Sequence, residues 1–549
     1  MSEPITKRTI LITGATDGIG KALAEHYSTK GWQSQPARLI FIGRRSLIDA
    51  STIDPTLFTA DSYCQANLAE LESAESIVTW LREKQITQID LLIHNAGIGY
   101  VGRAHDQPAD NIRQLINVNL RTPIALTHHL LPHLKNATGQ THNSKIVFIS
   151  SVAATLPTPH YAVYTATKAA LDGFVRNLQI ELAADPATQT LRAQLISPGA
   201  TRTNMHAKSG ADLDPQKFPT AQKVAAKIVA TIDTNRRTKT IGPFNQLLKF
   251  TGKHAAFILD PLVRIRTIRT TQSTQTQQQP ASIPQPNSVE KAADHLGTCT
   301  ITGAADGIGK ALALRFATSG YAIKGIDIDA DRSATTETEL RDSGAEATFL
   351  VANLLDPADL ERTQINLAAG PSITTLVHNA GINAVGHFAQ LDLASQLRVL
   401  DLNFTAPLLL TADLLSANKL QPGGSIIFLS SLSHYVSYPG AAVYAATKDG
   451  IASYARSLSA ALAIQKINVL TVFPGPTRTA HARRYSPDNS RENNRMSPDE
   501  LAQQIVNATA ARRRILIPGS VNRIFATLGR IAPRAMEFAM RKTLLDKLE

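Results

Sequence analysis

Thr13-Gly-Ala-Thr-Asp-Gly-Ile-Gly-Lys-Ala-Leu-Ala24 decides the fold of this chain, because it returns almost unchanged as Thr302-Gly-Ala-Ala-Asp-Gly-Ile-Gly-Lys-Ala-Leu-Ala313. Each copy follows an apolar, β-branched run and opens an Ala/Leu-rich helical pattern, which predicts a strand, a glycine turn and a helix. The glycines let the backbone approach a phosphate, and the free N–H groups of the helix start stabilise its charge. We expect a dinucleotide phosphate at both turns, which contain Gly14, Gly18, Ile19 and Gly20, and Gly303, Gly307, Ile308 and Gly309.

The repeat divides the 549-residue chain into two domains of similar size, since one core rarely holds so long a chain. Both halves alternate apolar runs with helical patterns, which predicts the α/β class: two tandem doubly wound, parallel-sheet (Rossmann) domains, each with a basic, apolar helical tail. We expect the first domain at 1–269 and the second at 296–549. Residues 270–295 are rich in Gln, Thr and Pro and predict a linker, either a flexible tether or a plain fusion joint.

The composition is typical of soluble globular domains, with 43% hydrophobic and 18% charged residues. No unbroken run of 18 apolar residues would cross a bilayer, and the N-terminus lacks the apolar core of a signal peptide. Cys64 and Cys299 are the only cysteines, one in each domain and without metal-ligand spacing. They predict reduced structural thiols, a cytoplasmic protein and no metal site.

The net charge of +12 is concentrated at the end of each domain. Eight Lys and Arg residues accompany a single acid between Arg236 and Arg269, and nine accompany three acids between Arg512 and Glu549. Because these residues alternate with Leu, Ile and Phe, the pattern favours a membrane surface or an anionic amphipathic substrate over a nucleic-acid groove. Ordinary core or dimer-contact helices with solvated Lys and Arg would show the same pattern, so both interpretations stay open.

The second strand of each domain is followed by a different residue type. Leu39–Ile42 leads to Arg44 and Arg45, whereas Ala322–Ile326 ends at Asp327, which we place opposite Arg44. In a doubly wound fold this strand end meets the adenosine ribose, where arginine favours a 2′-phosphate and an acid accepts from the ribose hydroxyls. We therefore expect NADP in the first domain and NAD in the second, the alternative being that these residues only solvate a loop.

Further motifs follow the two turns in the same order. Each half has an Asn-Ala-Gly, a helical Asn, a Ser after a buried strand, a Tyr thirteen residues later, a Lys four residues after the Tyr, and a Pro-Gly followed by a Thr. These are Asn95, Gly97, Asn119, Ser151, Tyr164, Lys168 and Thr203, and then Asn379, Gly381, Asn403, Ser431, Tyr444, Lys448 and Thr479. With the glycine turns, they resemble the full motif series of the short-chain dehydrogenase/reductase family over almost the whole chain apart from the linker and tails.

The resemblance implies a role for each residue type. The tyrosine exchanges the alcohol proton while the nicotinamide exchanges a hydride, and the serine binds the substrate oxygen. The lysine also binds the nicotinamide ribose, the helical asparagine holds a water in the proton relay, and Asn67 and Asn353 stand where the family often has an aspartate near adenine. A Tyr and a Lys four apart share one helix face, so the ammonium favours the phenolate; we expect the nicotinamide charge and partial burial to lower the tyrosine pKa further.

We therefore expect two complete alcohol and ketone oxidoreductase domains that act on a hydrophobic or lipid-like secondary alcohol. A sharper hypothesis is that one domain oxidises and the other reduces, which inverts a stereocentre. In the alternative, only one domain is active and the other is a dinucleotide-binding sensor or a pseudo-dimer partner. The assembly stays open between an intrachain pseudo-dimer and a homo-oligomer.

Overall fold

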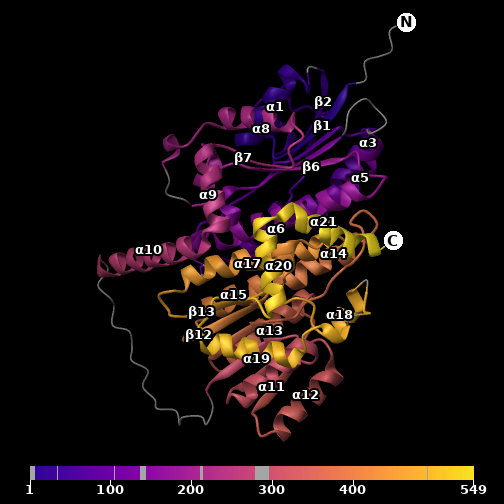
Figure 1. Cartoon of the computed structure of the whole chain (residues 1–549). Coiled ribbons are helices and arrows are strands. Elements are labelled where there is room, and N and C mark those ends of the chain that lie inside the picture. Colours follow the sequence, from indigo (N-terminus) through magenta and orange to yellow (C-terminus); the bar gives the residue numbers. More distant parts are fainter. Residues whose placement is uncertain are drawn as a thin grey trace.

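The computed structural model describes residues 7–33, 35–103, 106–136, 144–210, 214–277, 296–486, 488–490 and 492–548. Two seven-stranded parallel sheets lie at opposite ends of this part of the chain, with a layer of helices between them (Figure 1). In spatial order, the first sheet contains β3 (Tyr63–Gln65), β2 (Ala37–Gly43), β1 (Arg8–Thr13), β4 (Leu91–His94), β5 (Lys145–Ile149), β6 (Arg192–Ser197) and β7 (Thr238–Thr240).

The second sheet repeats this order. It contains β10 (Ala347–Val351), β9 (Ala322–Asp327), β8 (Thr298–Thr302), β11 (Ile373–His378), β12 (Leu420–Leu429), β13 (Asn468–Val472) and β14 (Ile515–Leu516). In both sheets the strand order reverses direction beside the first strand, which is the doubly wound topology. The predicted pair of Rossmann domains is confirmed.

Helices cover both faces of each sheet, which is why the central strands β1 and β8 are buried along their whole length. The outer helices are α1 (Gly18–Lys30), α2 (Leu47–Ser51) and α8 (Ala221–Ile232) in the first domain, and α11 (Gly307–Thr318), α12 (Ala330–Asp342) and α19 (Pro498–Ala510) in the second. The middle layer holds α3 (Ser73–Glu83), α4 (Ala109–Ile116), η1 (Asn117–Arg121), α5 (Thr122–Asn136) and α6 (Ala162–Ala184), with α13 (Pro357–Ala369), α14 (Leu393–Leu400), η6 (Asp401–Thr405), α15 (Ala406–Ser416) and α17 (Ala442–Ala461).

The middle layer joins the two domains. α6 and α17 pack along each other between the sheets (Figure 1). One apolar cluster runs through the layer, with Phe174 of the first domain 5.1 Å from Phe388 of the second, measured between ring centroids. Arg121 also forms an ion pair with Asp401 at 2.7 Å. The two helices that carry the predicted Tyr and Lys therefore lie back to back.

Short elements and the tails complete the chain. The short elements are η3 (Val152–Thr155), η4 (Pro159–Tyr161), α7 (Asn204–Lys208), η5 (Pro215–Lys217), α16 (Ser433–Val436), α18 (Ala480–Tyr485), η7 (Glu492–Asn494) and η8 (Leu545–Lys547). The tails are α9 (Pro243–His254) with α10 (Ala256–Gln277), and α20 (Ser520–Ile531) with α21 (Pro533–Thr543). Since α10 continues to Gln277, the first part of the expected linker at 270–295 is helical, and residues 278–295 lie outside the described residues.

One helical stretch, Leu393–Ser416, is long and apolar enough to cross a membrane, with a mean hydropathy of 1.3. A search for an unbroken apolar run misses it because Arg398 and Asp401 interrupt the run. The stretch comprises α14, η6 and α15 of the middle layer, and 72% of its most apolar window is buried inside the protein. Its packing accounts for its apolar character.

Candidate active sites

Both glycine turns have a backbone that only glycine fits. Gly14 and Gly303 have φ of 68° and 66°, in the left-handed region. A Cβ at Gly14 would lie 2.8 Å from Cα of Ala96, and one at Gly303 would lie 2.9 Å from Cα of Ala380. The helices α1 and α11 begin directly after the turns, so each turn presents a helix N-terminus to a phosphate.

The predicted Asn-Ala-Gly motifs hold these turns in place. The side-chain amide of Asn95 donates to the carbonyls of Thr13 and Gly14 at 3.0 and 3.2 Å. Asn379 repeats this in the second domain, with distances of 3.1 and 2.8 Å to the corresponding carbonyls. Each asparagine therefore locks the turn to the end of the neighbouring strand.

The structure brings the predicted threonines to the same turns. A Cβ at Gly18 would lie 2.9 Å from Cγ2 of Thr203, and a Cβ at Gly307 would lie 3.4 Å from Cγ2 of Thr479. These threonines follow the sixth strand of each sheet, so the segment after that strand closes against the helix start. Glycine turn, Asn-Ala-Gly motif and threonine form one cradle in each domain.

The adenosine ends of the two cradles differ, but not at the pair of residues that we expected. Thr13 pairs with Ile42 and Thr302 pairs with Ile326, so Asp327 lies at the position of Gly43, and Arg44 corresponds to Ile328. The placement of Asp327 opposite Arg44 is therefore wrong by one residue, because pairing with the first strand of each sheet fixes the correspondence, and not the first charged residue after each apolar run. Asp327 of the second domain thus corresponds to Gly43 of the first, and Arg44 and Arg45 follow that glycine.

These residues contact the glycine turns. The carboxylate of Asp327 accepts from the backbone N–H of Ala305 at 2.9 Å. In the first domain, the guanidinium of Arg45 donates to the carbonyl of Thr16 at 3.4 Å, and Arg44 is exposed. One turn is thus held by an acid and the other by a base.

Asn67 and Asn353 follow the third strand of each sheet, as expected. The side-chain oxygen of Asn67 accepts from the backbone N–H of Ala69 at 3.3 Å, and that of Asn353 accepts from Leu355 at 3.1 Å. Both amides stabilise a local turn at the sheet edge where the cradle ends.

The Ser, Tyr and Lys residues converge in each domain. Lys168 is buried, and its ammonium donates to the carbonyl of Ile149 at 3.1 Å; Lys448 donates to the carbonyl of Leu429 at 2.9 Å. Each carbonyl belongs to the strand end two residues before the serine that the sequence predicts to be catalytic. The following strand-to-helix segment positions the serine, whose oxygen accepts a backbone N–H two residues further on at 3.1 Å in both domains.

Burial changes the acidity of both pairs. It raises the pKa of Tyr164 and of Tyr444 above the usual value, and hydrogen bonds with the catalytic serines oppose this change. Burial also lowers the pKa of Lys168 and of Lys448 to about 8. The expectation that partial burial lowers the tyrosine pKa is wrong, because burial disfavours the charged phenolate. A nearby positive charge has to supply the lowering; the ammonium of Lys448 lies 5.4 Å from the centroid of the Tyr444 ring.

Asn119 and Asn403 lie in short π-helical turns, η1 and η6. The side chain of Asn119 accepts from the N–H of Ile98 and donates to the carbonyl of Ile98, both at 3.0 Å. Asn403 makes the same pair of bonds to Ile382, at 2.9 and 2.8 Å. A single-turn π-bulge often marks a functional site, and here it aims the amide at the segment after the Asn-Ala-Gly motif.

Sequence reasoning missed an aromatic wall of each site. The ring of Tyr161 contacts Tyr164 edge-on, with centroids 5.9 Å apart, and Tyr438 contacts Tyr444 at the same distance. One tyrosine lies three residues before the catalytic tyrosine and the other lies six before it, so no shared spacing reveals them. No local pattern marks Glu181 of α6 either, because its contacts lie in the other domain.

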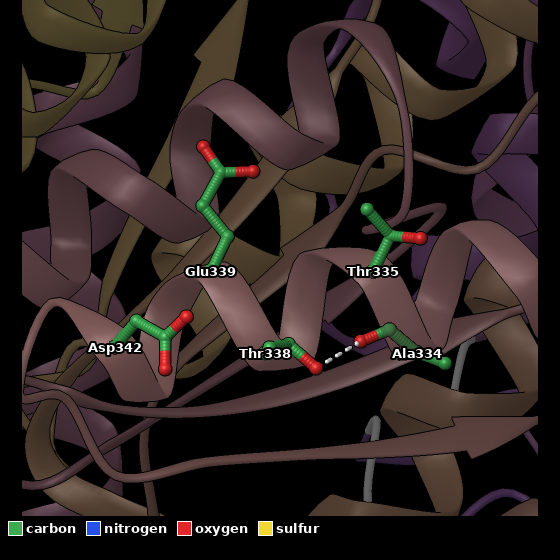
Figure 2. Close-up of a pocket in the computed structure, with 5 residues that line it drawn as sticks. All are labelled: Ala334, Thr335, Thr338, Glu339 and Asp342. Atoms are coloured by element: carbon green, nitrogen blue, oxygen red, sulfur yellow. Dashed lines mark hydrogen bonds between the residues drawn. The ribbon is translucent and has the colours of Figure 1, made fainter.

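A surface hollow on α12 is lined by Ala334, Thr335, Thr338, Glu339 and Asp342 (Figure 2). All five are exposed residues of one helix, and the Thr338 hydroxyl donates to the Ala334 carbonyl at 2.9 Å. None of them belongs to the predicted site, and no side chain from another element lines the hollow. We therefore assign no catalytic role to it.

Residues 8–214 and 298–490 each match the family model described as short chain dehydrogenase. The two segments contain both glycine turns and both Ser-Tyr-Lys sets, and together they make up more than half of the chain.

Individual relatives match about one domain. An uncharacterized oxidoreductase of Escherichia coli is 30% identical over 247 residues, 43% of this chain and 90% of that protein. The 11-beta-hydroxysteroid dehydrogenase A of Sesamum indicum is 28% identical over 202 residues, and the chain spans only 53% of the length of that protein. Among solved structures, a short-chain dehydrogenase from Sphingobium yanoikuyae in complex with NADPH is 31% identical, with a TM-score of 0.39 over 43% of this chain and 93% of that one.

Proposed function

The chain belongs to the short-chain dehydrogenase family, and on that premise we propose that it is a tandem NAD(P)-dependent oxidoreductase in which each domain interconverts secondary alcohols and ketones. The observation that carries the proposal is the duplicated geometry of the catalytic residues. In both domains a buried lysine donates to the carbonyl two residues before the serine, at 3.1 and 2.9 Å. Two such sets support turnover in both halves.

The residues of both cradles fit a nicotinamide dinucleotide. Glycine at positions 14 and 303 lets each turn pack against the backbone of Ala96 or Ala380 just before a helix N-terminus, which suits a pyrophosphate. When bound there, the dinucleotide supplies the acceptor or donor of a hydride. Lys168 lies beside the Asn-Ala-Gly motif, since a Cβ at Gly97 would lie 3.4 Å from its ammonium. Lys168 and its counterpart Lys448 would hold the nicotinamide ribose.

Residues of the chain itself transfer the hydroxyl proton. During oxidation the carbon loses a hydride and the hydroxyl proton passes to the phenol oxygen of Tyr164 or Tyr444; reduction reverses both transfers. The serine hydroxyl holds the substrate oxygen beside the phenol. Since burial raises the tyrosine pKa, the adjacent ammonium is needed to stabilise the phenolate that accepts the proton.

The two domains use different cofactors in this proposal, NADP in the first and NAD in the second. Support comes from Arg44 and Arg45, which follow Gly43 and would pair with a 2′-phosphate, and from Asp327, whose carboxylate would repel one. With unequal cofactor pools, one domain oxidises a hydrophobic secondary alcohol and the other reduces the ketone from the opposite side. The pair then inverts a stereocentre.

The alternative is that one domain turns over and the other acts as a dinucleotide-binding sensor or as a pseudo-dimer partner. The back-to-back packing of α6 and α17 supports an intrachain pseudo-dimer in either case. A cytoplasmic setting is supported by Cys64 and Cys299, which are both buried free thiols; burial raises the pKa of Cys64 to about 12.

Single-tyrosine variants separate these possibilities. A panel of enantiopure hydrophobic alcohols is incubated with NAD+ and NADPH, and the products are resolved by chiral chromatography. We expect the full chain to form the opposite enantiomer, Tyr164→Phe to stop at the ketone and Tyr444→Phe to leave the alcohol unchanged. Return of the starting enantiomer by the full chain would contradict inversion. If one variant formed the same products as the full chain, the domain that carries its substitution would be assigned to the sensor role.

A further inference from the structure

The two tails are built alike. α9 and α20 both begin after a glycine with positive φ, Gly242 at 94° and Gly519 at 82°. Three residues further on, Asn245 and Asn522 each donate to the carbonyl that precedes the glycine, at 2.7 Å in both tails. α9 therefore leaves the first sheet with the same local geometry with which α20 leaves the second.

Both helices lie very close to the segment after the catalytic serine. A Cβ at Gly252 would lie 2.3 Å from the carbonyl oxygen of Thr155, and one at Gly529 would lie 2.2 Å from that of Tyr435. The glycine side of each helix is thus fixed against η3 or α16, and another side remains free of that contact.

That other side is apolar and exposed. On α20 the exposed side chains follow the i, i+3, i+4, i+7 spacing of one helix face: Val521, Ile524, Phe525, Leu528 and Ile531, the last being 76% exposed. The first tail exposes Phe244, Leu247, Phe250, Phe257, Ile258, Leu262 and Ile265, with Phe257 at 77%. A soluble protein rarely leaves so many large apolar side chains together in water.

The two tails lie on the same side of the molecule. Glu537 of α21 forms an ion pair at 3.1 Å with Arg237, which lies just before β7 and α9. Burial lowers the pKa of His254 at the end of α9, and the charges of Lys253 and then of Arg530 on α20 lower it further. In Figure 1, α10 and α21 run in opposite directions from the middle of the molecule, as expected for two helices related by a two-fold axis between the domains. The two tails therefore lie on either side of this axis.

The same helices are basic. Their charged residues are Lys249, Lys253, Arg264, Arg266, Arg269, Arg523, Arg530, Arg534, Arg541 and Lys542, against Asp260 and Glu537 alone. Both acids are paired with arginines outside the four helices, Asp260 with Arg456 and Glu537 with Arg237. Of these basic residues, Lys249 is paired with Asp172 and Arg541 with Asp546, and the tail helices keep a positive excess beside the apolar surface.

We propose that this tail surface, formed by α9, α10, α20 and α21, docks on an anionic lipid membrane. Exposed Phe, Ile and Leu side chains enter the headgroup boundary, and the neighbouring Lys and Arg residues pair with lipid phosphates. A two-fold axis perpendicular to the membrane lets both tails bind at once, which raises the overall affinity. The helices lie in the membrane plane, because among the described residues no helix of the tails meets the length and hydropathy of a membrane span.

Vesicle sedimentation of the full chain tests the docking. We expect pelleting with phosphatidylcholine vesicles that contain about 30% phosphatidylglycerol, and much weaker pelleting with pure phosphatidylcholine or in about 1 M salt. The double variant Ile524→Asp/Ile531→Asp removes two exposed apolar side chains and should bind at least about tenfold more weakly. Ile365→Asp is the matched control, since Ile365 is 63% exposed on α13, outside the tails, and it should bind like the unaltered chain.

Two results would overturn the proposal. The first is that the unaltered chain stays in the supernatant with anionic vesicles. The second is that light scattering without vesicles shows a concentration-dependent doubling of mass that the tail variant abolishes, while vesicles bind neither protein; the surface would then belong to a second copy of the chain.

A different observation concerns Glu181, a buried residue near the end of α6 in the first domain. Its two carboxylate oxygens accept backbone N–H groups of the second domain, one from Phe388 at 2.7 Å and one from Gly440 at 2.8 Å. Asn177, one turn earlier, accepts the N–H of Tyr438 at 2.7 Å. One helix of the first domain thus holds three backbone groups of the second.

These backbone groups belong to loops on either side of the second catalytic site. Phe388 follows the Asn-Ala-Gly motif, while Tyr438 and Gly440 precede Tyr444. The loops are bonded to each other, since the N–H of Gly386 donates to the carbonyl of Gly440 at 2.8 Å. Glu181 therefore fixes the walls of the site without touching the reacting atoms.

The second domain supports the first site with weaker contacts. Glu181 lies seventeen residues after Tyr164, and the residue seventeen after Tyr444 is Ala461, which has no side-chain acceptor. The counterpart of Asn177 is Ser457, whose hydroxyl accepts the N–H of Thr158 at 3.2 Å. At the position of Glu181, the second domain therefore has no carboxylate to offer the first site.

We further infer that Glu181 is a positioning residue for the second active site, so that the first domain sets the competence of the second. Glu181→Gln keeps the size of the side chain but replaces one acceptor oxygen with a donor. In the full chain, above about pH 7 where the carboxylate is ionised, deuterium exchange should become faster in peptides around Phe388 and Gly440. The exposed Glu361→Gln on α13 is the control and should change neither peptide.

Kinetics distinguish positioning from general loosening. In a Tyr164→Phe background, Glu181→Gln should lower kcat/KM of the second domain for a panel of hydrophobic ketones by about tenfold or more, as expected for one lost charge-assisted bond. In a Tyr444→Phe background, the first domain should keep its rate. Equal losses in both backgrounds, or unchanged exchange at Phe388 and Gly440, would overturn this role; absence of turnover in every background would instead count against the proposed function.

Discussion

The carboxylate of Asp327 accepts a hydrogen bond from the backbone N–H of Ala305 at 2.9 Å, so the end of the second strand is tied to the glycine turn of the second domain. Gly43 occupies the equivalent position in the first domain, with Arg44 and Arg45 directly after it. Two otherwise matched cradles therefore present opposite charges at the adenosine end. We expect this difference to set the cofactor preference of each domain.

Substitution of Asp327 and its neighbour should change the cofactor preference of the second domain. Asp327→Gly with Ile328→Arg gives the second domain the residues that the first has at Gly43 and Arg44. Removal of the acid and addition of a phosphate partner should shift the NADPH-to-NADH affinity ratio of that domain by about 10- to 100-fold, the worth of one charge-assisted hydrogen bond. Fluorescence titration with both dinucleotides measures the affinity ratio. Arg113→Ala is a surface control and should leave the NADPH-to-NADH affinity ratio of the second domain unchanged.

Glycine at the turn is required for space as well as for backbone angle. Gly303→Ala places a Cβ 2.9 Å from Cα of Ala380 at a φ of 66°, so we expect loss of dinucleotide binding by the second domain. Gly344→Ala is the matched control, because its φ is 84° and nothing lies within 4 Å of the added atom. Both variants should lose about 1–2 kcal/mol from backbone strain, but only Gly303→Ala should lose binding in calorimetry. Loss of binding by both would show that strain alone explains the effect.

Glu181 predicts how stability changes with pH. Burial raises the pKa of Glu181 from 4.5 to about 7, although the N–H groups of Phe388 and Gly440 oppose the change. The folded chain therefore holds the proton more tightly than the unfolded chain, so this stabilisation is complete below pH 4.5 and is lost as pH rises through about 7. Its full size is about 3 kcal/mol. Thermal melts should show the Tm of the unaltered chain falling relative to that of Glu181→Gln between about pH 5 and 8; parallel Tm curves would contradict the shift.

Local sequence patterns were enough for the parts of the site that each domain builds from its own chain. The glycine turns, the Asn-Ala-Gly motifs and the Ser-Tyr-Lys spacing depend on short stretches whose backbone is dictated by strand, turn and helix signals. Both sheets have the order that these patterns predicted, and in each half the predicted lysine lies at the strand end that precedes the predicted serine.

Features that depend on packing could not be predicted in the same way. Asp327 lies opposite Gly43 and not opposite Arg44, because the correspondence is set by how each second strand pairs with the first strand and not by the charged residues that follow it. The partners of Glu181 lie in the other domain and have no spacing along the chain that would connect them. The effect of burial on the tyrosine pKa likewise became visible only with the packed helices α6 and α17.

The central claim is that the chain carries two working sites with different cofactors. Steady-state oxidation of NADH and of NADPH by Tyr164→Phe and by Tyr444→Phe, with one panel of hydrophobic ketones, tests it most directly. We predict that Tyr164→Phe, which leaves only the second site intact, consumes NADH, and that Tyr444→Phe, which leaves only the first, consumes NADPH. The same cofactor preference in both variants, or no turnover in one of them, would contradict the claim.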